Sequence, residues 1–78
     1  MITERHKAHE FFAAQRLLRL PEVVARTGLG KSSIYKRIAA GTFPAPVPLT
    51  ATARAWCESE VMAWVAERVA ERDAGGAR

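Results

Sequence analysis

Three prolines at every second position, Pro44, Pro46 and Pro48, restrict how this chain can fold more than any other feature. Proline has no backbone N–H and a fixed φ, so this segment can be neither a helix nor a central β-strand. Successive N–H groups of an extended chain point to opposite edges, and the three missing donors therefore share one edge. Residues 43–49 can pair only along the other edge, as the outer strand of a two-stranded hairpin.

The partner strand of this hairpin is predicted at residues 53–56, with residues 50–52 at the tip. Two short helices precede the hairpin. Pro21 suits the first position of the first helix, and Gly28 can adopt the left-handed conformation that ends this helix. A second helix is predicted over residues 31–40. Two short helices joined by a Gly-containing turn form a helix-turn-helix, and a hairpin that follows them is a wing.

A last helix is predicted over residues 58–72. One apolar stripe at helical spacing supports it, formed by Val61, Trp64, Val65 and Val69. Trp56 and Trp64 are expected to clamp the hairpin and this helix onto the helix pair. Arg68 and Arg72 interrupt the stripe, so the final turns are expected to extend past the core.

The predicted fold is therefore mainly α, a small winged helix-turn-helix of three helices plus a two-stranded β-hairpin wing over residues 17–72. Residues 1–16 show no clear period and are predicted to be a flexible or partly helical arm. Residues 73–78 are predicted to be a disordered tail. Residues 18–20 alternate apolar and basic side chains, which suits a short extended lead into the domain.

The length of 78 residues excludes several classes of protein. So small a domain has a thin core and cannot enclose the deep pocket that most enzymes need. We expect no enzyme activity, no cofactor and no small-molecule effector. The single cysteine, Cys57, cannot form an internal disulfide and fits a reducing cytoplasm. The apolar runs fall far short of the roughly 20 residues of a membrane span, so no membrane partner is expected.

Two alternative sites that involve Cys57 are weak. His6, His9 and Cys57 offer three metal ligands but no CxxC pair, and solvated histidines are the better interpretation. Cys57 beside a histidine resembles a nucleophile pair, but no third orienting group is visible. Neither a metal site nor a catalytic site is predicted.

The positive charge is concentrated in the middle of the chain. Overall, 12 Lys and Arg stand against 8 Asp and Glu, a net charge of +4. Residues 16–54 hold seven basic residues against Glu22 alone, whereas residues 55–78 are net acidic. A basic middle beside an acidic end is what a polyanion-binding face with a solvated back needs. On charge alone, a merely soluble surface explains the pattern equally well.

The second helix has a small, polar and cationic outward side. At about 100° per residue, Ile34 and Ile38 define its buried side. The outward side then consists of Ser32, Lys36, Ala39 and Ala40, with Ser33 and Tyr35 flanking it. A helix that enters a DNA groove needs such a surface. A solvated helix face is the alternative.

The chemistry of these side chains suggests separate roles on DNA. Lys36 can donate to guanine acceptors in the major groove, and Ser32 can do so by a shorter reach or through water. The other residues of the helix are expected to bond phosphates without reading sequence, namely Lys31, Ser33, Tyr35 and Arg37. Arg19, just before the first helix, is a further candidate for DNA contact.

A family resemblance covers residues 18–68. The motifs that carry it are Pro21-Glu22-Val23, Thr27-Gly28-Leu29, Ser33-Ile34-Tyr35, Phe43-Pro44, and Trp56 with Glu60-Val61 and Trp64. In this combination the chain resembles the AlpA family of phage- and prophage-associated regulators, within the excisionase-like and MerR-like winged helix-turn-helix proteins. The resemblance implies a small protein that binds double-stranded DNA. It implies either control of recombinase transcription or an excisionase that bends attachment-site DNA.

The chain departs from this family at the tip of the wing. Similar proteins carry a glycine and a basic residue there, where this chain has Thr50, Ala51 and Thr52. We therefore expect Thr50, Thr52 and Arg54 to contact the DNA backbone. Cys57 is a second departure, because it stands at an N-cap position that Ser, Thr or Asp would fill better.

The sequence predicts a transcriptional regulator of AlpA type and leaves two alternatives. An excisionase would load cooperatively and bend DNA strongly. A protein-binding adaptor would use Met62 and Trp64 of the last helix, and its binding would depend little on salt. Whether the protein forms a homo-oligomer or a cooperative array on DNA stays open.

Overall fold

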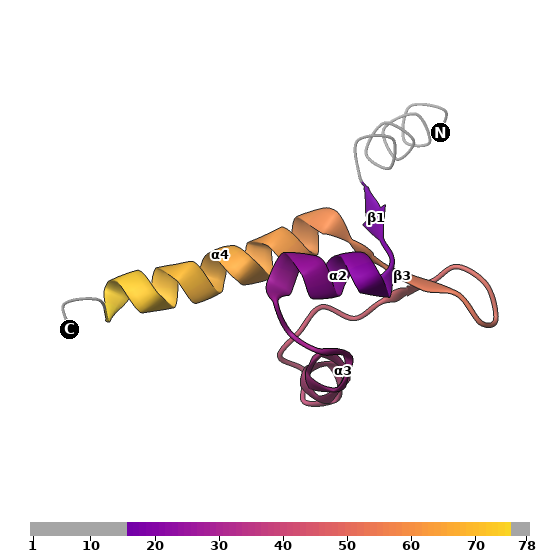
Figure 1. Ribbon diagram of the computed structural model, residues 1–78, viewed down its shortest axis with the longest axis horizontal. Helices are drawn as coiled ribbons and strands as arrows, with labels where there is room; N and C mark the ends of the chain where they lie inside the picture. Colours follow the sequence, from indigo (N-terminus) through magenta and orange to yellow (C-terminus); the bar gives the residue numbers. More distant parts are fainter. Residues whose placement is uncertain (1–15, 76–78) are drawn as a thin grey trace, which may run out of the picture.

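Three helices and a small sheet make up residues 16–75, the part of the chain that the computed structural model describes (Figure 1). The elements in chain order are β1 (Leu17–Leu18), α2 (Leu20–Thr27), α3 (Lys31–Ala39), β2 (Val47–Pro48), β3 (Arg54–Cys57) and α4 (Glu58–Ala74). Helix α3 is seen nearly end on where α2 lies across the view, so the two helices cross at a large angle. The predicted winged helix-turn-helix is confirmed.

Helix α2 begins one residue before the predicted position. Arg19 is extended, with φ −83° and ψ 166°, and serves as the N-cap. The carboxylate of Glu22 accepts a hydrogen bond from the backbone N–H of Arg19 at 3.1 Å, which is one half of a capping box. Leu20 is therefore already helical, and the prediction of an extended segment over 18–20 is wrong at its last residue. Gly28 ends the helix at φ +77°, as predicted.

The turn between α2 and α3 is fixed by the hydroxyl of Thr27. Its Oγ1 donates to the carbonyl of Val23 at 2.8 Å and accepts from the N–H of Leu29 at 3.1 Å. The end of α3 is fixed differently. There, the N–H of Thr42 donates to the carbonyl of Arg37 at 2.8 Å, beyond a left-handed Gly41.

The sheet has three strands in the order β1-β3-β2, and the prediction of a two-stranded hairpin is incomplete. The predicted pairing of β2 with β3 is present, with Pro48 opposite Arg54. The N–H of Leu49 donates to the carbonyl of Ala53 at 2.7 Å, along the edge that keeps its donors. Strand β1 occupies the other edge of β3, because Leu18 is fully buried where it pairs with Trp56.

Two tryptophans hold the chain that follows α3. Trp56 is 1% exposed, and its Nε1–H donates to the carbonyl of Pro44 at 3.0 Å. Trp64 on α4 donates to the carbonyl of Thr42 at 2.8 Å, and its ring meets Phe43 edge-on at 5.0 Å. The buried core consists of Leu18, Val23, Ile34, Phe43, Ala55, Trp56 and Val61. The two tryptophans therefore join β3 and α4 to the helix pair, as predicted.

Helix α4 extends past the core and ends at Ala74, two residues beyond the predicted boundary. Residues 73 and 74 are therefore helical, which corrects the predicted tail. In these turns Arg68 pairs with Glu71 at 2.6 Å, one helical turn apart, and this supports the helix where it has no core to pack on. The remainder of the tail, residues 76–78, and residues 1–15 of the predicted arm lie outside the described residues.

Replacing Trp56 with alanine tests the core. We expect Trp56→Ala to lower the free energy of unfolding by about 3–5 kcal/mol, because a large buried ring is lost together with its hydrogen bond. The measurement is urea denaturation followed by far-UV circular dichroism. Trp56→Phe, which keeps an aromatic ring, is the control and should lose less. An unchanged free energy of unfolding in Trp56→Ala would show that this ring does not hold the wing.

Candidate nucleic-acid interface

The basic residues of the described chain fall into two sets. The first set has carboxylate partners and consists of Arg16, Arg26, Arg68 and Arg72. Among residues 16–75, the second set has no carboxylate within 4.0 Å and consists of Arg19, Lys31, Lys36, Arg37 and Arg54. The second set belongs to α3, to the residue before α2 and to β3. Uncompensated positive charge is thus concentrated on α3 and its neighbours.

The predicted sides of α3 are confirmed. Ile34 is fully buried, and Ile38 packs against the core. The residues exposed on the outward surface are Lys31, Ser32, Tyr35, Lys36, Ala39 and Ala40. Apart from Tyr35 at its edge, this surface carries only small or cationic side chains.

Ser33 and Arg37 lie one helical turn apart at the edge of this surface. Both are half-buried, and the guanidinium of Arg37 donates to the hydroxyl of Ser33 and to its carbonyl. Ser33 is therefore already occupied as an acceptor. Arg37 keeps further N–H groups that can bond a phosphate.

The tip of the wing is closed by Thr50. Its Oγ1 accepts hydrogen bonds from the N–H groups of Thr52 at 3.2 Å and Ala53 at 3.0 Å. Both acceptor positions of the hydroxyl are thus used, and its proton remains available for donation. The wing tip is an ordered turn that presents donors and no carboxylate.

Four predicted contact residues from different elements meet beside the wing. Arg19 Nε donates to the carbonyl of Arg54 at 3.0 Å. The ring of Tyr35 meets Trp56 edge-on at 6.3 Å and 66°. Together with Thr52, these side chains line a hollow of about 220 Å³.

The sequence identified these four residues one at a time and missed that they converge. Arg54 and Trp56, two residues apart on a strand, point to the same side. How close these two residues lie to Arg19 depends on the pairing of β1 with β3. A two-residue strand carries too little periodicity to reveal that pairing.

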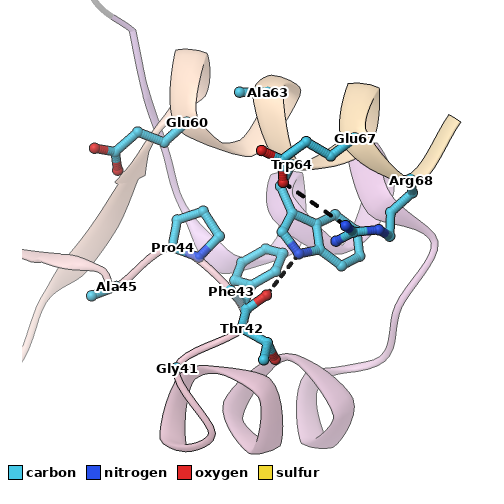
Figure 2. A pocket seen from close by; sticks show the side chains of 10 residues that line it. All are labelled: Gly41, Thr42, Phe43, Pro44, Ala45, Glu60, Ala63, Trp64, Glu67 and Arg68. Atoms are coloured by element: carbon cyan, nitrogen blue, oxygen red, sulfur yellow. Dashed lines mark hydrogen bonds and ion pairs between the residues drawn. The ribbon is translucent and has the colours of Figure 1, made fainter. Parts of the chain in front are cut away.

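A larger open groove, of about 720 Å³, lies on another side of the protein between residues 41–45 and α4 (Figure 2). Trp64 and Phe43 form part of its wall, and Arg68 lies 4.9 Å from the Trp64 ring. Glu60 and Glu67 also line it. These carboxylates make the groove unsuitable for a polyanion, so its greater size does not make it the nucleic-acid site.

Cys57 is not an activated nucleophile. Its burial raises the pKa of the thiol, and the nearby Glu60 carboxylate raises that pKa further. The thiol is therefore protonated at neutral pH, the opposite of what a reactive cysteine needs. Within residues 16–75 no group of three or more His, Cys, Asp or Glu side chains could hold a metal ion. His6 and His9 lie outside the described residues.

Residues 16–69 match the family described as prophage CP4-57 regulatory protein (AlpA). The chain belongs to the AlpA family. This segment runs from β1 into α4 and confirms the resemblance drawn over residues 18–68. No helix within residues 16–75 combines the length and apolar character needed to cross a membrane.

Two relatives of this AlpA-family chain come from a phage and a bacterium. The Enterobacteria phage P4 protein ORF88 is 48% identical over 61 residues, which cover 78% of this chain and 69% of the phage protein. The DNA-binding transcriptional activator AlpA of Escherichia coli K12 is 32% identical over 62 residues, covering 72% of this chain and 89% of that protein. No solved structure matches.

The raised pKa of Cys57 predicts slow alkylation. At neutral pH we expect iodoacetamide to react with the folded protein more slowly than with the same protein in urea, because less thiolate is present. The rate should rise as the pH is increased above the ordinary thiol range. Mass spectrometry of quenched samples measures both rates. A folded protein that reacts faster than the unfolded one would contradict the environment described for Cys57.

Proposed function

We propose that this AlpA-family protein is a sequence-specific DNA-binding transcriptional regulator that inserts α3 into the major groove. The observation that carries the proposal is the separation of the basic residues into paired and unpaired sets. Cations that serve only solubility would be scattered over the surface. Here the five unpaired cations lie on α3, before α2 and on β3. The carboxylates that form ion pairs in the described chain neutralise basic residues elsewhere.

The comparison with the Escherichia coli relative supports the same function. That protein is described as a DNA-binding transcriptional activator, and this chain covers 89% of its length. A match over nearly the whole relative includes the part that would contact DNA. The direction of regulation, activation or repression, is not carried over.

Different residues of the interface have different tasks. Lys36 is exposed, has no carboxylate partner and can donate to guanine O6 and N7. Ser32 lies beside it and can donate to a base directly or through water. The remaining residues fix the register on the phosphates, namely Lys31, Ser33, Tyr35, Arg37, Arg19, Thr50, Thr52 and Arg54.

The test of function begins by selecting DNA duplexes from a random-sequence pool with the wild-type protein. The binding of the protein to the selected duplexes is then measured at several salt concentrations. Each phosphate that a cation neutralises contributes about −0.9 to the slope of log affinity against log salt. The four cations assigned to phosphates therefore predict a slope of roughly −3 to −4. A footprint over a promoter and altered output of a reporter carrying it would support regulation. Failure to enrich any sequence, or binding that is insensitive to salt, would favour a protein-binding adaptor. Strong bending with cooperative loading would favour an excisionase.

Lys36→Ala separates base reading from phosphate binding. We expect it to weaken binding to the selected duplex by about 1–3 kcal/mol, while affinity for random DNA falls less, because a base contact is lost. The melting temperature should not change, since Lys36 is exposed. Gel-shift titrations on both duplexes measure the effect, with Arg72→Ala, a paired arginine on α4, as control. Equal losses on the two DNAs would make Lys36 a phosphate contact.

A further inference from the structure

We propose that the small hollow beside the wing is a binding site for a single DNA phosphate, here called the phosphate notch and lined by Arg19, Tyr35, Thr52 and Arg54. The inference rests on the proposed function, because the ligand is a backbone diester of the bound duplex. It goes further by assigning one phosphate to residues from four separate parts of the chain. The notch would join the wing to α3 through the DNA.

The groups around the notch are hydrogen-bond donors. Arg19 uses only its Nε on the carbonyl of Arg54, which fixes the guanidinium and leaves its two NH₂ groups available. Neither the guanidinium of Arg54 nor the hydroxyl of Tyr35 has a hydrogen-bond or ion-pair partner among residues 16–75. Two guanidinium groups and a phenol at one hollow match the acceptors of a phosphate.

No carboxylate lines the notch. The nearest acid in sequence to Arg19 is Glu22, and its two oxygens are taken by the side chain of Arg16 at 3.3 Å and by the backbone N–H of Arg19. That pairing leaves the Arg19 guanidinium without an acidic partner. The positive charge at the notch is therefore not cancelled from within the described chain.

The size of the notch selects the kind of ligand. Its volume of about 220 Å³ is below the roughly 300–1,000 Å³ of pockets that enclose a drug-sized molecule. A single phosphate group needs little depth and requires donors from several sides. The notch supplies donors from the residue before α2, from α3, from the wing loop and from β3, and this arrangement suits one phosphate on a polymer.

The position of the notch gives this phosphate a mechanical role. Tyr35 lines the notch and Lys36, the next residue, lies on the exposed surface of α3. A diester held by Tyr35, Arg19 and Arg54 would therefore fix how α3 lies relative to the groove that Lys36 reads. Phosphate contacts that set register in this way carry no sequence information themselves.

The test uses selected duplexes in which one phosphate at a time is replaced by an uncharged methylphosphonate. We expect the wild-type protein to lose about tenfold in affinity at one phosphate per binding site, the effect of losing a charged hydrogen bond. Arg54→Gln and Tyr35→Phe should lose a similar factor on the unmodified duplex. Both should then be less sensitive than the wild type to the replacement at that phosphate. Tyr35→Phe keeps the ring against Trp56, so its fold should be unchanged.

Lys31→Gln is the matched control, because Lys31 is an unpaired cation of α3 outside the notch. It should weaken binding yet stay sensitive to the replacement at the notch phosphate. If Arg54→Gln and Tyr35→Phe remain as sensitive as the wild type at every phosphate, the notch is refuted while DNA binding stands. If the wild-type protein shows no salt-dependent DNA binding, the proposed function fails as well. Tight binding of inorganic phosphate to the protein without DNA would identify a free-anion site and overturn the assignment to a diester.

Discussion

The packing of the Trp56 side chain in the core is the interaction on which the rest of the structure depends. Its strand pairs with β1 at Leu18 on one edge and with β2 on the other. Its indole N–H binds the carbonyl of Pro44, and its ring meets Tyr35 of α3. One side chain thus sets the position of the wing, of the segment after α3 and of a residue on the exposed side of α3. In a domain with so thin a core, no second layer can substitute for it.

The same architecture separates charges of opposite sign. Carboxylates of α4 pair with arginines, as Glu58 does with Arg26 of α2. Two further carboxylates of α4, those of Glu60 and Glu67, line the groove beside Trp64. The cations of α3 and of its neighbours have no such partners among residues 16–75. A polyanion approaching the protein is therefore attracted to one surface and repelled from another, which orients the encounter before any specific contact forms.

Much of this could be predicted from the sequence because the signals are local. The buried side of α3 follows from Ile34 and Ile38, the end of α2 from Gly28, and the single pairing edge of the wing from its alternating prolines. Extended backbone at Leu18 was predicted, but the pairing of β1 with β3 could not be, since the partners of β1 lie far along the chain. For the same reason the contact of Arg19 with Arg54, 35 positions away, could not be predicted from the sequence. The last turn of α4 was missed because residues 73 and 74 have no apolar stripe, whereas the helix there is held by surface ion pairs.

We propose that DNA binds at the unpaired cationic surface of α3 and the wing. The most direct measurement is the change in backbone amide chemical shifts when a selected duplex is titrated into isotopically labelled protein. We expect the largest changes to fall on α3, on the wing and around Arg19, with residues of α4 beyond Trp64 little affected. Largest changes along the groove between residues 41–45 and α4, with the amides of α3 unmoved, would contradict it.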